Sequence, residues 1–128
     1  MLSQEGYIAK VLELLNMDKG HSTATPGMPG KYYDANSGTA SIANSHSYLH
    51  IIGSMMYGMT QTRPDYAFQI SHLASFAKNP SDEHFSGMKH LIRYLRGTAD
   101  YRIIYGSIKD ADLIGYSNTN FGACKVTR

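Results

Sequence analysis

Histidine is the residue type in this chain that is best suited to metal chemistry. Six histidines lie at positions 21, 46, 50, 72, 84 and 90. Two imidazoles four residues apart share one face of a helix and can bind one zinc ion, and only His46 and His50 have that spacing. The pair spans a predicted helix start, and no carboxylate motif accompanies it. We therefore expect solvated or capping histidines and no metal site.

A row of basic residues is the second candidate for chemistry. Lys89, Arg93 and Arg96 recur at helical spacing, and Arg63 and Lys78 precede them in the chain. Cations on one face can follow the phosphates of a nucleic acid. The alternative, which spacing alone favours, is that they form only the solvated side of an amphipathic helix. Motifs of hydrolases and nucleotide-binding proteins, such as G-x-S-x-G or the P-loop, are absent from the sequence.

Composition limits the class of protein. The 128 residues, 42% of them hydrophobic, suit one domain with a modest core, and a formal charge of +2 gives no strong overall field. A single cysteine, Cys124, rules out an internal disulfide framework and fits a reducing compartment. No apolar run approaches the roughly 20 residues of a membrane span, and the N-terminus lacks signal-peptide features. We expect a soluble intracellular protein, cytoplasmic or nuclear.

The hydrophobic pattern predicts the elements that position these residues. In residues 1–17, an apolar stripe at helical spacing (Ile8, Val11, Leu12 and Leu15) predicts a helix. Residues 18–46 are rich in Gly, Pro, Ser, Thr and Asn without any period, which predicts a flexible linker. Residues 47–97 are predicted to be helical in three segments, with breaks at "TRPD" and "NPSDEH", Ser81 as the last N-cap and Gly97 as the last end.

The remaining residues, 98–128, contain two short apolar runs, "YRIIY" and "DLIGYS". They read as two strands joined by a polar turn, so we predict a β-hairpin there. The expected fold is mainly α, a small bundle of about four helices with a short C-terminal β-hairpin.

Several motifs together carry a family resemblance. "IIGSMMY", "TRPD", "NPSDEH", "RYLRGT" and "LIGYSNTNFG" follow one another along the chain. In this order they closely resemble copia-type (Pseudoviridae) LTR-retrotransposon polyproteins, in the reverse transcriptase thumb and connection region that runs into the start of ribonuclease H. The resemblance implies a post-palm helix at 1–17, a thumb and connection region at 47–97 and a truncated ribonuclease H start at 98–128.

The same resemblance implies that the chain is not an enzyme. The Y-x-D-D palm signature of the parent RNA-directed DNA polymerases, whose aspartates bind magnesium, is expected before Met1. Asn118 and Asn120 align with the two aspartates of the family motif G-Y-S-D-A-D. An amide oxygen is a much weaker magnesium ligand than a carboxylate, and further ligands are expected beyond Arg128. We expect no cofactor and no catalytic residue.

The helix around "IIGSMMY" is similar to the retroviral thumb helix that contacts the minor groove of primer and template. Gly53 and Tyr57 match the glycine that permits close approach and the aromatic residue that packs against sugars, and their i, i+4 spacing places both on one face. Leu49 stands where the family commonly has arginine. This change removes a cation from the face that is expected to meet nucleic acid.

The expected function is therefore a noncatalytic retrotransposon fragment that binds RNA–DNA or DNA duplex weakly and without sequence preference. The residues predicted to bind nucleic acid are Leu49, Gly53, Tyr57, Arg63, Lys89, Arg93 and Arg96. The alternative is a domesticated module derived from the same fragment, in which helix faces that once packed on the palm bind a protein or a second copy. Salt dependence would separate the two, because only nucleic-acid binding weakens steeply with salt.

Overall fold

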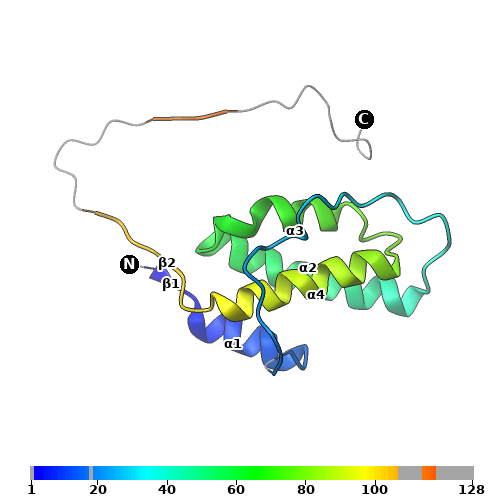
Figure 1. The fold of residues 1–128 in the computed structure, drawn as a ribbon, viewed down its shortest axis with the longest axis horizontal. Helices are drawn as coiled ribbons and strands as arrows, with labels where there is room; N and C mark the ends of the chain where they lie inside the picture. The colour runs from blue at the N-terminus through cyan, green and yellow to red at the C-terminus, as the bar shows by residue number, and fades with distance from the viewer. Residues whose placement is uncertain (1, 18, 107–113, 118–128) are drawn as a thin grey trace.

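The structure is a computed structural model, and it describes residues 2–17, 19–106 and 114–117. Figure 1 shows a helical bundle, which confirms the mainly α prediction. Its helices are α1 (Glu5–Leu14), α2 (Ile42–Gln61), α3 (Ala67–Ala74) and α4 (Asp82–Gly97), with a 3₁₀ turn η1 (Pro64–Tyr66) before α3. Because α1 and α3 each pack against both α2 and α4, the latter two lie across the core from one another.

The core is built from one apolar stripe of each helix. Ile8 and Leu12 come from α1, and Tyr48 and Met55 come from α2. Further members from η1, α3, α4 and the turn between α3 and α4 are Tyr66, Ile70, Leu73, Phe76, Met88, Leu91, Ile92 and Leu95. Burial of this apolar area is the main force that holds the helices together. No helix in the described ranges is both long enough and apolar enough to span a bilayer.

Side chains at the helix ends explain where α2 and α4 begin. The Ser41 hydroxyl accepts a hydrogen bond from the Asn44 amide at 3.1 Å, so α2 starts earlier than the expected boundary at residue 47. The predicted N-cap of α4, Ser81, has that role in the structure. His84 closes a capping box there, since its Nδ1 accepts the Ser81 amide at 2.9 Å.

A two-stranded antiparallel sheet is present, but its strands differ from the predicted hairpin. Strand β1 (Leu2–Ser3) pairs with β2 (Arg102–Ile103), with Leu2 opposite Ile103. Residues 114–117 form no strand, and 107–113 lie outside the described residues. Strand β2 pairs with the N-terminal strand β1 because the bundle brings them together. β1 leads into α1, α1 packs on α4, and α4 leads toward β2.

The segment between α1 and α2, residues 19–41, has no helix or strand and is called the strap here. It crosses α4 on its way to α2 (Figure 1). Tyr33 places its ring in the core, with only 3% of the residue exposed. The strap runs antiparallel to α4, with successive contacts between Ser22 and Gly97, Thr25 and His90, Tyr33 and Gly87, and Asp34 and His84.

Candidate nucleic-acid interface

The predicted thumb residues lie together on the stripe of α2 that faces outward. Leu49 is 58% exposed and Tyr57 is 53% exposed, and Met56 lies beside them at 38%. Gly53 lies between them, and apart from its chain neighbours and the backbone of its own helix, no atom is within 4 Å of the point where its Cβ would stand. We call these four residues the α2 ridge. Gly53 forms an open notch in it, so another molecule could approach the helix backbone at this point.

The opposite stripe of α2 fixes the orientation of the ridge. Tyr48 is completely buried, and its hydroxyl donates a hydrogen bond to the Leu73 carbonyl at 2.9 Å. The Tyr66 hydroxyl donates to the Met55 carbonyl at 2.7 Å. Burial raises the pKa of both tyrosines, which keeps them neutral donors. These bonds and the apolar contacts of the buried stripe turn the ridge toward solvent.

Tyr57 is positioned by a contact with α1. The rings of Tyr7 and Tyr57 meet edge to face, with their centroids 4.9 Å apart. The Tyr7 hydroxyl in turn donates to the Ser54 carbonyl at 2.7 Å. Edge-to-face contacts restrict an aromatic side chain while leaving part of the ring accessible. The exposed part of Tyr57 could therefore stack on or pack against a sugar or base.

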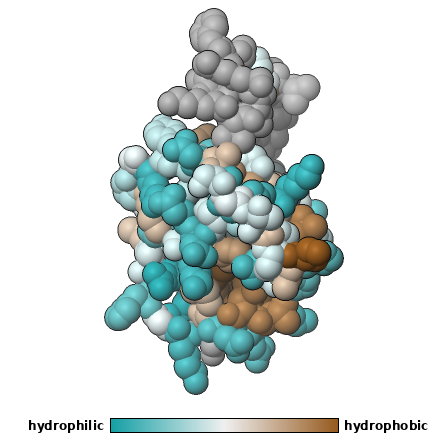
Figure 2. Space-filling model, turned by 90° about the vertical axis from the view of Figure 1, so that its right-hand side faces the viewer, coloured by the Kyte–Doolittle hydropathy of each residue, from teal (hydrophilic) through white to brown (hydrophobic). Residues whose placement is uncertain are grey.

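The ridge lacks the charge that phosphate binding requires. Helix α2 contains no Lys, Arg, Asp or Glu along its 20 residues. The polar residues nearest the ridge in sequence include His46 and His50, both of them exposed. Figure 2 shows that, on the face it presents, brown apolar residues interrupt an otherwise hydrophilic surface. Contacts through the ridge would be apolar and aromatic, with little help from phosphate neutralisation.

Arg63 was predicted to bind nucleic acid, but in the structure it does not lie on a surface that could meet phosphates. The residue is 1% exposed. Its Nε and Nη2 donate to the two carboxylate oxygens of Asp65 at 2.9 and 2.8 Å, in a bidentate pair. Its Nη1 donates to the Thr98 carbonyl at 2.8 Å, and Nη2 also donates to the Thr98 hydroxyl at 2.6 Å. The donors of Arg63 are therefore directed inward.

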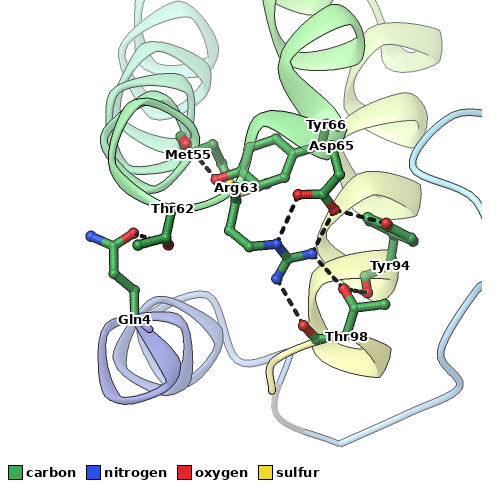
Figure 3. Close-up of polar contacts among 8 residues, drawn as sticks. All are labelled: Gln4, Met55, Thr62, Arg63, Asp65, Tyr66, Tyr94 and Thr98. Carbon is green, nitrogen blue, oxygen red and sulfur yellow. Dashed lines mark hydrogen bonds and ion pairs between the residues drawn. The ribbon is translucent and has the colours of Figure 1, made fainter. Parts of the chain in front are cut away.

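The Arg63 network joins two of the family-like motifs (Figure 3). Arg63 and Asp65 belong to "TRPD", whereas Tyr94 and Thr98 belong to "RYLRGT". The Tyr94 hydroxyl donates to the Asp65 carboxylate at 2.8 Å. The rings of Tyr66, Tyr94 and Tyr101 lie 5.3–5.8 Å from the guanidinium carbon, which adds cation–π attraction. The two motifs thus hold the α2–α3 turn against the end of α4.

Asp65 is held in its charged form by this network. Partial burial acts to raise the pKa of its carboxyl group, but hydrogen bonds from Arg63 and Tyr94 outweigh burial and place the pKa below its ordinary value. Next to it, the Thr62 hydroxyl donates to the Gln4 side chain at 2.8 Å (Figure 3). The residues around Arg63 therefore fasten three segments of the bundle.

The basic residues of α4 lie apart from the α2 ridge. Lys89 and Arg93 are exposed and one turn apart. Arg96 is half-buried, with Nη1 near Gly20 of the strap and without a hydrogen-bond partner among the described residues. Since α2 and α4 lie across the core from one another, their outward stripes face different sides of the bundle. The predicted nucleic-acid residues thus fall into three separate places: the ridge, the buried network and α4.

Metal ligands do not gather in the described ranges of the chain, where no three His, Cys, Asp or Glu residues could hold one ion. The capping role of His84 agrees with the sequence expectation for one of the histidines. Asn118 and Asn120 lie outside the described residues. Their neutral amide oxygens do not suit magnesium, which prefers carboxylates and water.

Sequence reasoning missed Tyr33 as a core residue, and it did not single out His84 among the six histidines as the one that caps a helix. Tyr33 lies in a segment without periodicity, so nothing in the pattern marked it as a core residue. His84 had a detectable signal, because it stands three residues after the Ser81 N-cap, where Glu or Gln usually completes a capping box. Arg63 also had one, since Asp65 lies two residues away within "TRPD".

Comparison with known proteins places the chain among retrotransposon polyproteins. It is 33% identical over 124 residues to the retrovirus-related Pol polyprotein from transposon TNT 1-94 of Nicotiana tabacum, covering 93% of this chain and 9% of that protein. It is 32% identical to the corresponding polyprotein from transposon RE1 of Arabidopsis thaliana, covering 97% of this chain and 8% of that protein. A third relative, the secreted RxLR effector protein 161 of Plasmopara viticola, is 36% identical over 74 residues, which are 58% of this chain and 52% of the effector.

Other comparisons gave no match. No protein-family model matches the chain, and no solved structure matches it. The chain spans less than a tenth of the two transposon polyproteins, so it is homologous to one short segment of each. These relatives confirm the motif resemblance: the chain is homologous to one segment of the Pol polyproteins of copia-type retrotransposons.

Proposed function

We propose that this segment is a noncatalytic, thumb-like part of a retrotransposon polyprotein that contacts nucleic-acid duplex weakly through the α2 ridge. The observation that carries the proposal is the open notch at Gly53, flanked on one exposed stripe by Leu49 and Tyr57. A helix without a side chain at an exposed position can approach a shallow groove closely. An exposed tyrosine one turn away adds a stacking surface that accepts any base or sugar.

The charge of the ridge makes this binding weak. Each phosphate that a protein neutralises adds about 0.9 to the slope of log affinity against log salt. With no Lys or Arg on α2, binding through the ridge should have a slope below about 1 and an affinity near or below the nonspecific range of about 10⁻⁴–10⁻⁶ M. Binding through Lys89 and Arg93 on α4 would instead give a slope of about 2.

The noncatalytic part of the proposal rests on residue chemistry. Asn118 and Asn120 stand at positions where the family motif has aspartates. Two-metal phosphoryl chemistry needs several carboxylates converging on the ions, and neutral amides do not replace them. We expect no polymerase or ribonuclease H turnover with magnesium or manganese. Asn118→Asp and Asn120→Asp should not restore it, because two carboxylates from one segment are fewer than the several that two-metal chemistry needs.

A second candidate function is self-association through the same ridge. The specific observation in its favour is that α2 presents Leu49, Met56 and Tyr57 to solvent without any charged residue on the helix. Because the helix carries no charged residue, the ridges of two copies can meet without charge repulsion between them and bury these side chains. Such an interface would be insensitive to salt and would depend on protein concentration.

One experiment separates the two candidates. The purified chain is titrated into a fluorescent RNA–DNA primer–template duplex at several salt concentrations, and its mass in solution is measured over the same protein concentrations. The proposal predicts weak saturable duplex binding by a monomer. A chain that forms a dimer and leaves the duplex unbound would replace the first candidate with the second.

A further inference from the structure

His84 fastens the strap to α4 from a fully buried position. The residue is 0% exposed, and its ring stacks on Phe76 with the centroids 4.0 Å apart. Its Nε2 lies 2.9 Å from the Asp34 carbonyl oxygen of the strap. Its Nδ1 lies 2.9 Å from the Ser81 amide and 3.1 Å from the Ser81 hydroxyl. One imidazole thus joins the strap to the first turn of α4.

These partners determine the protonation state of His84. A carbonyl oxygen only accepts, so Nε2 must carry the proton that bonds Asp34. A backbone amide only donates, so Nδ1 must be unprotonated to accept the Ser81 amide. Only the neutral ring with its proton on Nε2 satisfies both. A proton added at Nδ1 would make this nitrogen a donor that faces another donor, the Ser81 amide, and would bury a positive charge.

The other fastenings of the strap do not depend on proton uptake in this way. The Nε2 of His90 lies 3.0 Å from the Thr25 carbonyl and can donate to it whether the ring is neutral or charged. Lys31 pairs with Glu83 at 3.3 Å on the surface, where ion pairs contribute little. Tyr33 is buried, yet its hydroxyl has no hydrogen-bond partner among the described residues, which weakens the attachment.

We propose that the strap is an acid-released cover of the surface where α3 meets α4, around Gly87 and Leu73, with His84 as its proton-sensitive latch. Protonation of His84 removes the capping bond with Ser81, and the strap with Tyr33 lifts from α4. The site that opens is the floor under Tyr33, formed by Gly87 and Leu73. This device is independent of the α2 ridge and of any nucleic-acid binding.

The direction of the effect follows from the surroundings of His84. Burial lowers the pKa of the ring, and the bond to the Asp34 carbonyl acts in the opposite direction without overcoming it. The titratable groups that face the ring are Tyr33 of the strap, His72 of α3 and Glu83 of α4. Since the pKa is lower when the strap is closed, closure is most stable above the ordinary pKa of histidine and weakens as pH falls through it.

The test is amide hydrogen exchange of the whole chain at pH 7.5 and 5.5, read residue by residue by NMR and corrected for the intrinsic effect of pH. The informative amides are Ala40, which donates to the Asn79 side chain at 2.7 Å, and Ser81. For one histidine with an open-state pKa of about 6.5, opening should increase by up to about tenfold between these two values. Amides inside α2, at Ile52 and Met55, serve as the internal reference and should not change.

Two variants test whether the pH dependence of exchange comes from the imidazole of His84. His84→Gln should abolish the pH dependence, because glutamine can complete a capping box with Ser81 and donate to Asp34 at any pH. The matched variant His90→Gln should retain it. The proposal is overturned if Ala40 exchange is independent of pH in the wild type, if α2 opens in parallel, if His84→Gln keeps the dependence, or if His90→Gln removes it. Should His84→Gln not fold, the wild-type comparison of Ala40 with α2 still decides.

Discussion

Two regions of the molecule that contain family-like motifs, the Arg63 network and the α2 ridge, differ in charge and in exposure. Arg63 is a cation that resembles a phosphate contact in the sequence, yet it is 1% exposed and paired with Asp65. The ridge has no cation, yet it is exposed and has an open notch at Gly53. A basic residue in a motif therefore does not identify a binding surface unless its donors are free, and "TRPD" here stabilises the fold.

The largest expected effect is loss of stability when the Arg63 network is broken. Arg63→Met keeps much of the side-chain volume but leaves Asp65 and Thr98 without their main donor. We expect the free energy of unfolding to fall by about 2–3 kcal/mol, because the partly buried Asp65 carboxylate and the buried Thr98 oxygens lose their charged donor. Urea denaturation measures it. The matched surface variant Lys89→Met should change stability by less than about 0.5 kcal/mol, and equal losses in the two variants would refute the structural role.

Substitution of glycine should change stability in opposite directions in the packed region around Gly87 and on the ridge at Gly53. Gly87→Ala places a Cβ 2.7 Å from Tyr33 Cζ, so the strap must shift and stability should fall by about 1–3 kcal/mol. Gly53→Ala meets no neighbouring atom and should raise helix stability by up to about 1 kcal/mol. Thermal and urea unfolding of the two variants provide the measurement. A loss of stability in Gly53→Ala would mean that the notch is not open.

Acid stability should depend on Asp65. Its folded-state pKa is lower than its unfolded-state value, so its contribution is present above the ordinary carboxyl pKa and is lost as pH falls through the folded value. Asp65→Asn should therefore be less stable than the wild type at neutral pH, and the difference should narrow as pH falls below about 4. Urea unfolding at pH 7, 5 and 3 tests this expectation. A difference that stays constant across this range would contradict it.

The smallest expected effect is a change in salt dependence at the ridge. Leu49→Arg returns a cation to the face where the family commonly has one. It should tighten duplex binding and steepen the slope of log affinity against log salt by about one unit. Leu49→Gln, uncharged and of similar length, should leave the slope unchanged. If both variants behave like the wild type, the ridge does not meet the phosphate backbone.

The helices were predictable because residue spacing and capping within each segment determine them. The contacts that hold the helices together were not predictable, because they join distant parts of the chain. The stripe of α1 and both ends of α4, the Ser81 cap and Gly97, follow from spacing and capping chemistry, and the structure confirms them. Tyr33 enters the core from a segment without periodicity, because Gly87 has no side chain and leaves room for its ring. The partner of β2 is set by how α1 packs on α4. Such long-range choices leave no periodic signal in the sequence.

The same distinction holds for the candidate site. The family motifs correctly placed Leu49, Gly53 and Tyr57 on one exposed stripe, since helical spacing settles this. They could not separate Arg63 from Lys89 and Arg93, because burial depends on Asp65 and Thr98 closing around one of three similar cations. Whether any of these residues binds nucleic acid stays a prediction.

Duplex binding by Gly53→Leu, measured by fluorescence anisotropy beside the double variant Lys89→Ala/Arg93→Ala, tests the assignment of the ridge most directly. Leucine at 53 would hold the helix away from a groove without removing any charge, and circular dichroism would verify that the helix is intact. We expect Gly53→Leu to weaken binding by about tenfold or more, equivalent to about 1.4 kcal/mol, and the double variant to keep most of it. Unchanged binding by Gly53→Leu together with loss of binding in the double variant would place the interface on α4 and refute its assignment to the ridge.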